Sequence, residues 1–94
     1  MRILIVEDEK KVAAFIKKGL EEETYAVDTA SDGEEGLHLG EQNPYDLIIL
    51  DLMLPKINGL DILSSLRSKK IDTPILLLTA KDSVNDKVEG LNQG

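Results

Sequence analysis

The chain has 94 residues, 41% of them hydrophobic, which is enough for one small domain and too few for two. Eighteen acidic against eleven basic residues give a formal net charge of −7, which disfavours direct binding of this segment to nucleic acid or to an anionic membrane surface. There is no cysteine, no signal-like N-terminus and no apolar run near the ~18 residues that a membrane span needs, so the sequence predicts a cytoplasmic protein.

Short apolar segments alternate along the chain with segments whose apolar residues recur at helical spacing. The apolar runs are too short for helices and rich in branched residues, which is typical of buried strands. One segment, 25–30, alternates between two faces instead, as expected of a half-exposed strand at the edge of a sheet. In chain order, the sequence predicts strands at 3–6, 25–30, 47–50 and 75–78, with amphipathic helices around 12–20, 32–41 and 60–66 between them.

Polar residues that accept hydrogen bonds from free backbone N–H groups mark the expected helix starts. The helix at about 32–41 contains Gly36 and Gly40, each of which costs ~1 kcal/mol relative to alanine, so its stability has to come from packing. The cap candidates are Ser31 with Glu34, Asn58 with Asp61, and Ser83 with Asp86, of which only the first is a full capping box.

Strand and helix therefore alternate four times. Crossovers between parallel strands are almost always right-handed, so this order predicts an α/β fold with a doubly wound parallel sheet covered by helices on both faces. Ligands of such sheets bind beyond the carboxyl ends of the strands, which is where functional residues are expected.

Acidic residues follow two of the buried strands directly. Glu7 and Asp8 come after the first strand, and Asp51 ends the third. If these strands are neighbours, their backbones lie only ~4.8 Å apart and the three carboxylates gather in one cluster. Two like charges ~4 Å apart repel by about 4 kcal/mol at an effective dielectric constant of ~20, so the cluster takes up a proton or binds a cation. Oxygen ligands alone suit Mg²⁺, whereas zinc is disfavoured by the absence of cysteine and the single histidine.

Asp51 is the candidate nucleophile of this cluster. A carboxylate beside such an ion can attack phosphorus and form an acyl phosphate, with Glu7 and Asp8 as the metal platform. Thr79 ends the next apolar run, where its hydroxyl can donate a hydrogen bond to a phosphoryl oxygen. Each feature alone has a simpler explanation: the acidic pair as a solvated loop or helix cap, Thr79 as an ordinary strand residue, Met53 as a loop or packing residue. It is the combination that indicates chemistry.

Three segments together resemble the receiver domain of two-component response regulators: ILIVEDE at residues 3–9, DLIILDLMLPKING at 46–59 and PILLLTA at 74–80. The resemblance covers nearly the whole chain, and the residues of these segments are similar to those of the OmpR/PhoB subfamily of transcription factors. The resemblance implies a flavodoxin-like (CheY-like) fold with strand order 2-1-3-4-5, in which the strands that carry the acids and Thr79 lie side by side.

By the same resemblance, Asp51 is the phosphoacceptor, Asp8 and Asp51 are direct Mg²⁺ ligands, and Glu7 is a ligand that often acts through water. Met53 supplies its backbone carbonyl to the ion, and Thr79 is the switch hydroxyl. The implied donor is a phosphohistidine on a sensor histidine kinase or a small phosphodonor, and slow hydrolysis of the acyl phosphate resets the switch. Such domains catalyse their own phosphorylation without being conventional enzymes, and the implied parent protein is a DNA-binding transcriptional regulator.

The family pattern continues beyond this chain. A fifth strand, a lysine at its end, an aromatic switch residue and a final helix are not among the 94 residues, so residues 1–94 are expected to be a receiver domain that is incomplete at the C-terminus, with strand order 2-1-3-4. The fourth strand is then expected to be an exposed edge through which the chain self-associates. Pro55 and Gly59 are expected to shape the loop after Asp51.

Two other hypotheses stand beside the phosphoacceptor. The first is a receiver fragment that is not phosphorylated and acts only as a self-associating or protein-interaction module. The second, a nucleotide-binding α/β enzyme, is disfavoured because residues 6–10 occupy the first turn, where a glycine-rich phosphate loop is needed.

Overall fold

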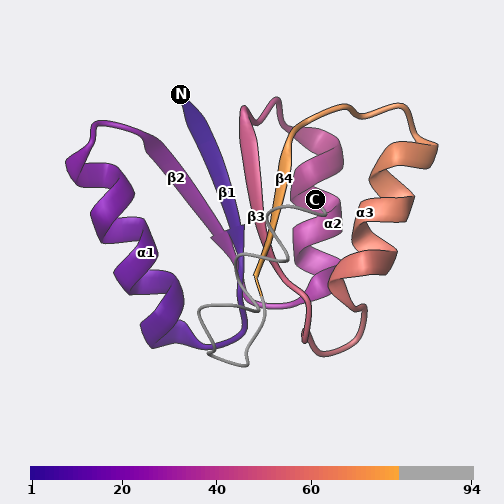
Figure 1. The fold of residues 1–94 in the computed structure, drawn as a ribbon, viewed down its shortest axis with the longest axis horizontal. Coiled ribbons are helices and arrows are strands. Elements are labelled where there is room, and N and C mark those ends of the chain that lie inside the picture. The colour runs from indigo at the N-terminus through magenta and orange to yellow at the C-terminus, as the bar shows by residue number, and fades with distance from the viewer. Residues whose placement is uncertain (79–94) are drawn as a thin grey trace.

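The structure, a computed structural model, describes residues 1–78 of the chain. Within these residues, four strands alternate with three helices (Figure 1), all at the predicted places and with ends that differ by a few residues. In chain order they are β1 (Arg2–Val6), α1 (Lys10–Glu22), β2 (Ala26–Ala30), α2 (Gly33–Gln42), β3 (Leu47–Asp51), α3 (Gly59–Ser68) and β4 (Ile75–Leu78). Among the described residues, no helix is long and apolar enough to cross a bilayer.

The strands form one parallel sheet in the order β2-β1-β3-β4. α1 covers one face of the sheet, and α2 and α3 cover the other, which gives three layers (Figure 1). In the register of the sheet, Val6 of β1 lies between Ala30 of β2 and Leu50 of β3. The predicted strand order 2-1-3-4, the edge position of β2 and the flavodoxin-like architecture are confirmed.

Side chains of the same strand fill both faces of the sheet in turn. Along β1, Ile3 and Ile5 pack toward α1, whereas Leu4 and Val6 pack toward α2 and α3, and none of the four is more than 1% exposed. Because helices cover both faces, a central strand is apolar at every position instead of alternating with polar residues. This is why β1 and β3 appear in the sequence as short continuous apolar runs.

The glycines of α2 allow this helix to lie close to the sheet. A Cβ atom at Gly36 would lie 2.6 Å from Cγ1 of Val6, so only glycine permits the observed approach. At Gly40 the corresponding Cβ would lie 3.4 Å from Leu66, an ordinary contact. The prediction that α2 depends on packing for its stability agrees with this arrangement.

The cap of α2 is one residue later than the sequence predicts. The expected box of Ser31 with Glu34 is wrong, because Asp32 is the N-cap and accepts a hydrogen bond from the N–H of Glu35 at 2.9 Å. The Ser31 N–H donates to the Glu35 carboxylate at 2.8 Å, so the reciprocal pattern exists with its register shifted by one. A carboxylate is a stronger acceptor than a hydroxyl at the positive end of a helix, which favours Asp32.

The other predicted caps have different outcomes. Asn58 caps α3 as expected and accepts a hydrogen bond from the N–H of Asp61 at 3.0 Å. The pair Ser83 and Asp86 lies outside the described residues.

Polar side chains join β1, β2 and the start of β3 at the amino end of the sheet. Nη2 of Arg2 donates to Oδ2 of Asp28 at 3.0 Å, and the guanidinium lies 5.0 Å from the ring centre of Tyr45. The Tyr45 hydroxyl donates to the same Asp28 oxygen at 2.7 Å, and the Arg2 backbone N–H donates to Asp46 at 2.8 Å. The hydrogen bond from Tyr45, with the help of Arg2, lowers the pKa of Asp28, and burial raises the pKa of Tyr45 to about 12. We call Arg2, Asp28, Tyr45 and Asp46 the amino-end cluster.

Candidate metal centre

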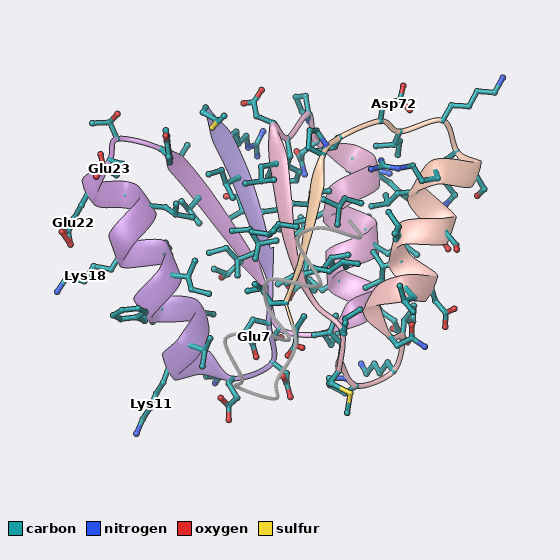
Figure 2. All side chains as sticks on the ribbon, in the orientation of Figure 1. Glu7, Lys11, Lys18, Glu22, Glu23 and Asp72 are labelled. Atoms are coloured by element: carbon teal, nitrogen blue, oxygen red, sulfur yellow. The ribbon has the colours of Figure 1, made fainter. Side chains whose placement is uncertain are left out.

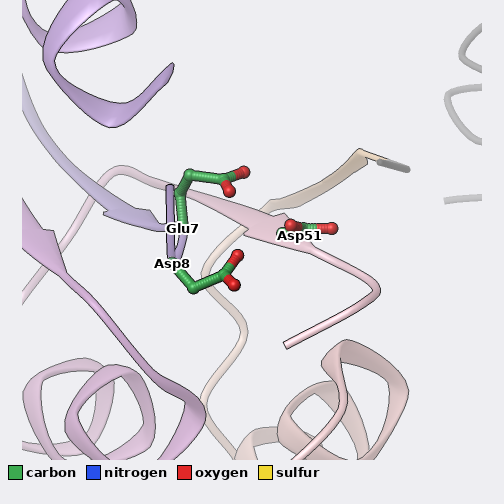
Figure 3. Close-up of side chains that lie close together, drawn as sticks. All are labelled: Glu7, Asp8 and Asp51. Atoms are coloured by element: carbon green, nitrogen blue, oxygen red, sulfur yellow. The ribbon is translucent and has the colours of Figure 1, made fainter. Parts of the chain in front are cut away.

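Three acidic side chains meet at the carboxyl end of the sheet. Glu7 and Asp8 follow β1, and Asp51 is the last residue of β3. Since Val6 lies beside Leu50 in a parallel register, the next residues of the two chains, Glu7 and Asp51, emerge side by side. Each acid offers a carboxylate oxygen, and these three oxygens all lie within 4.8 Å of one another. Figure 2 places Glu7 at this end of the sheet, and Figure 3 shows Glu7 and Asp8 directed to the side on which Asp51 lies.

This acidic cluster, Glu7 with Asp8 and Asp51, runs from the protein interior to the surface. Asp51 is only 3% exposed, Glu7 is half-buried and Asp8 is exposed. Two backbone groups orient the inner carboxylates: the N–H of Met53 donates to Oδ1 of Asp51 at 3.0 Å, and the N–H of Glu9 donates to Oε1 of Glu7 at 3.0 Å. The backbone therefore holds the carboxylates of the two inner acids in place.

The acidic cluster concentrates negative charge, and no basic side chain among residues 1–78 forms an ion pair with it. Burial raises the pKa of Glu7 from its ordinary value of 4.5 to about 7, the hydrogen bond from Glu9 opposes this shift, and the charge of Asp51 adds to it. A cluster of this kind holds a proton or a cation near neutral pH.

The chemistry of the donor atoms decides which cation fits. All three donors are carboxylate oxygens, and one member of the set is exposed. Mg²⁺ prefers oxygen ligands, binds through one or two carboxylates and keeps several waters, which suits an acidic cluster that is open on one side. The acidic cluster therefore fits Mg²⁺, and its lack of nitrogen and sulfur donors makes it a poor zinc site.

After Asp51 the chain turns back sharply, so that the first residue of α3 lies beside the end of β3. A Cβ atom at Gly59 would lie 2.7 Å from the backbone oxygen of Asp51, and the Gly59 N–H donates to the carbonyl of Leu52 at 3.3 Å. Glycine at the first position of α3 thus permits the close approach that the loop needs. Pro55 takes part in the same loop by accepting a hydrogen bond from the N–H of Ile57 at 2.9 Å.

Of the residues that the sequence assigns to the site, the structure brings Glu7, Asp8 and Asp51 together. Met53 lies in the loop after Asp51, and its side chain is 64% exposed, so the loop interpretation of this residue applies and the packing interpretation is wrong. The role of its backbone carbonyl as a metal ligand stays a prediction. Thr79 follows β4 directly and lies outside the described residues, so its role as the switch hydroxyl also stays a prediction.

The sequence did not single out two residues that hold the loop after Asp51, Gly33 and Lys56. An Asp-Gly dipeptide is a turn signal, and Asp32 with Gly33 does mark the start of α2. Nothing in that signal says which distant segment the turn faces.

A comparison with known protein families agrees with the geometry of the acidic cluster. The family model described as "Response regulator receiver domain" matches residues 3–94 of the chain. The chain belongs to this family. It is thus the receiver domain of a two-component response regulator, as its strand order and its acids at the carboxyl ends of β1 and β3 had indicated.

Curated relatives of this receiver domain include bacterial regulators. The transcriptional regulatory protein CusR of Escherichia coli is 51% identical over 94 residues, which cover 100% of this chain and 41% of CusR. The response regulator ArlR of Staphylococcus saprophyticus is 53% identical over 93 residues, which cover 99% of this chain and 42% of ArlR. The chain thus spans about two fifths of the length of these relatives. Their names agree with the predicted resemblance to the OmpR/PhoB subfamily.

Solved structures of receiver domains are similar to this one. The receiver domain of the Francisella response regulator 1452 superposes with a TM-score of 0.84 at 42% identity, covering 99% of this chain and 77% of that one. The response regulator TrrA of Thermotoga maritima, in complex with Mg(2+)-BeF, superposes with a TM-score of 0.81 at 40% identity, covering 97% of this chain and 81% of that one.

Proposed function

We propose that this receiver domain is a phosphorylation switch in which Asp51 accepts a phosphoryl group in a Mg²⁺-dependent reaction. The observation that carries the proposal is the convergence of three carboxylate oxygens within 4.8 Å, with the most deeply buried acid at the end of the central strand β3. The similarity to TrrA, whose structure is a complex with Mg(2+)-BeF, supports it.

Each member of the site has a role in this proposal. Glu7, Asp8 and Asp51 hold the ion, and the backbone carbonyl of Met53 is a further ligand. Bound Mg²⁺ neutralises charge on the transferring phosphoryl group. The Met53 N–H donates to Oδ1 of Asp51 and so helps to orient this carboxylate for attack. The hydroxyl of Thr79 donates a hydrogen bond to a phosphoryl oxygen and so reports the modification.

The proposed donor is a phosphohistidine on a sensor histidine kinase, or a small phosphodonor. A bond forms between a carboxylate oxygen of Asp51 and phosphorus while the bond from phosphorus to the donor breaks, and its electron pair leaves with the imidazole of the histidine or with the leaving group of the small phosphodonor. Hydrolysis of the resulting acyl phosphate resets the switch. Because CusR is named a transcriptional regulatory protein, we propose that the whole protein is a DNA-binding regulator whose DNA contacts lie outside this acidic segment.

The test compares Asp51, the last residue of β3, with Asp46, which lies just before this strand begins. The chain is incubated with a small phosphodonor in Mg²⁺ or in EDTA, and its mass and the modified peptide are determined. A phosphoryl increment on Asp51 that requires Mg²⁺, is lost in Asp51→Asn and persists in Asp46→Asn is the expected result. Asp46→Asn is the matched control because the amide oxygen still accepts the hydrogen bond from Arg2. A folded chain without any increment would show the alternative, a receiver that is not phosphorylated.

The alternative of a self-associating module has one observation in its favour. Within residues 1–78, β4 pairs only with β3 and forms an edge of the sheet, and Ile75, Leu76 and Leu78 of this strand are half-buried. An apolar edge strand is a template for pairing with a second chain. Light scattering over a concentration series measures this association, and a monomer at every concentration would exclude it.

A further inference from the structure

The loop that follows Asp51, residues 52–58, contains a strained turn. Lys56 has a backbone φ of 71°, and the N–H of Ile57 donates to the carbonyl of Pro55 at 2.9 Å across it. A positive φ combined with a hydrogen bond between residues two apart defines a γ-turn of the rare, strained form. A lysine persists in such a conformation only when its surroundings hold it there.

The first turn of α2 provides those surroundings. A Cβ atom at Gly33 would lie 2.4 Å from the carbonyl oxygen of Ile57 and 2.8 Å from its Cβ, so the backbone of the loop rests directly on the start of this helix. No other residue type fits at Gly33 without a shift of the loop or the helix. Ile57 also packs against the core between the sheet and the two helices, which fixes the contact from the other side.

An ion pair holds the same two segments together. Nζ of Lys56 lies 3.5 Å from Oδ2 of Asp32, while Oδ1 of Asp32 caps α2 by accepting the Glu35 N–H. The side chain of Asp32 is 25% exposed and that of Lys56 is 55% exposed, so the pair is partly screened by water. Asp32 thus starts the helix and tethers the centre of the strained turn.

The opposite end of the loop is tied to the acidic cluster. The N–H of Met53 donates to Oδ1 of Asp51, and the N–H of Gly59 donates to the carbonyl of Leu52. The loop is therefore fixed to the acceptor at its start and to α2 near its end. Only three residues separate Ile57, which lies against α2, from Met53, whose N–H contacts Asp51.

We propose that the first turn of α2, through Gly33 and Asp32, is a seat that positions the loop after Asp51 and so sets how well the acidic cluster binds Mg²⁺ and accepts a phosphoryl group. Gly33, Asp32 and Lys56 are positioning residues in this proposal, because none of them touches the ion or the reacting atoms. The inference rests on the proposed function, since it concerns the efficiency of the same site.

The main test is Gly33→Ala, with Gly40→Ala as the matched control in the same helix. At Gly40 an added Cβ meets Leu66 at an ordinary 3.4 Å, far along the helix from the loop. Both variants of the full chain are titrated with Mg²⁺ and followed by the amide signals of residues 52–58 in NMR spectra and by the rate of phosphorylation. Gly33→Ala is expected to move these amide signals without Mg²⁺ and to raise the half-saturating Mg²⁺ concentration roughly tenfold, since small displacements of positioned groups are costly. Gly40→Ala is expected to leave the amide signals and the half-saturating Mg²⁺ concentration at the wild-type values.

A second pair of variants tests the tether without a steric clash. Asp32→Asn keeps a good N-cap and removes the charge, and Lys56→Gln removes its partner. Each is expected to raise the half-saturating Mg²⁺ concentration about twofold, and the double variant no more than either alone, because an exposed pair is weak and its two halves are coupled. If Gly33→Ala does not fold, the Asp32 and Lys56 variants decide the question. Weaker Mg²⁺ binding in both variants, with no further loss in the double variant, supports the seat. Wild-type Mg²⁺ binding in both variants overturns it.

The remaining outcomes separate the seat from the proposed function. A Gly33→Ala chain with wild-type amide positions and Mg²⁺ binding overturns the seat while leaving the function intact. A loss that Gly40→Ala shares equally reflects the stability of α2 and also overturns it. If the wild-type chain neither binds Mg²⁺ nor becomes phosphorylated, the proposed function is wrong, and the amide positions in the two variants still decide whether α2 seats the loop.

Discussion

The two ends of the sheet arrange charge in opposite ways. In the amino-end cluster, Asp28 receives hydrogen bonds from a guanidinium and a phenol, which lower its pKa and keep it ionised. In the acidic cluster, three carboxylates gather without an ion pair among the described residues, and the pKa of Glu7 rises to about 7. The same type of side chain is satisfied by the protein at one end and left for a ligand at the other.

The amino-end cluster thus contributes to stability, whereas the acidic cluster is the candidate for function. The members of the amino-end cluster come from β1, β2 and the segment just before β3, so the charge there helps to hold the sheet together. In the acidic cluster, the raised pKa of Glu7 shows that the fold disfavours its charged form, and shifted pKa values of this kind are common at functional sites. Variants at each end should therefore change stability and ion binding in different ways.

The largest expected effect is on ion binding, in Asp8→Asn. Removing the charge of Asp8, a proposed ligand, should weaken Mg²⁺ binding about 100-fold, at the upper end of what changes around metal sites cause. The Mg²⁺-dependent rise in melting temperature measures this, because an ion that binds only the folded state stabilises it. The matched control is Asp28→Asn at the other end, which should lower stability and leave the response to Mg²⁺ unchanged. Equal Mg²⁺ responses in the two variants would contradict the division between the ends.

The next effect is on the pH dependence of stability in EDTA. The folded state raises the pKa of Glu7 from 4.5 to about 7, so it binds more protons than the unfolded chain between these values and loses stability as the pH rises through them. Partial exposure of Glu7 limits the loss to about 2 kcal/mol. Urea unfolding followed by circular dichroism at pH 5 and pH 8 should show this fall in the wild-type chain and a smaller one in Glu7→Gln. Parallel curves for the two chains would show that Glu7 titrates normally.

The smallest effect concerns the amino end, in Tyr45→Phe. Loss of the hydroxyl removes one hydrogen bond to Asp28, whose side chain is 42% exposed, so the cost at pH 7 should be about 1 kcal/mol. The depressed pKa of Asp28 contributes stability that is present above the unfolded value and lost as the pH falls through the folded one. The difference in unfolding free energy between Tyr45→Phe and the wild type should therefore vanish in acid. This pH dependence is opposite to that of Glu7, whose contribution to stability falls as the pH rises. Urea unfolding from pH 2 to pH 7 measures this difference. As a control, Tyr45→Phe should leave the proposed phosphorylation of Asp51 unchanged.

Patterns within single segments made most of the fold predictable. The continuous apolar runs of β1 and β3 identified buried strands, because helices cover both faces of the sheet. The acids at the ends of these runs located the acidic cluster, because parallel neighbouring strands end at the same edge. The position of Thr79 at the end of an apolar run marked it as a candidate, whereas the carbonyl role of Met53 came from the family resemblance alone, and both roles remain predictions.

Contacts between segments were beyond the reach of the sequence. The shift of the α2 cap from Ser31 to Asp32 depended on which of two adjacent acceptors the helix start would use. The contact of Gly33 with Ile57 depended on how closely α2 and the loop pack. The meeting of Arg2, Asp28 and Tyr45 depended on how β1, β2 and the segment before β3 pack together, for which no local pattern was available.

Sequence alone thus determined the order of the elements, the place of the sheet's functional edge and the identity of its acids, since hydrophobic period and the position of a charge at a strand end are local properties. Tertiary structure decided how that edge is supported: which acid is buried, which turn is strained and which glycine the loop rests on. These depend on distances between residues far apart in the chain, and such distances exist only once the layers have packed.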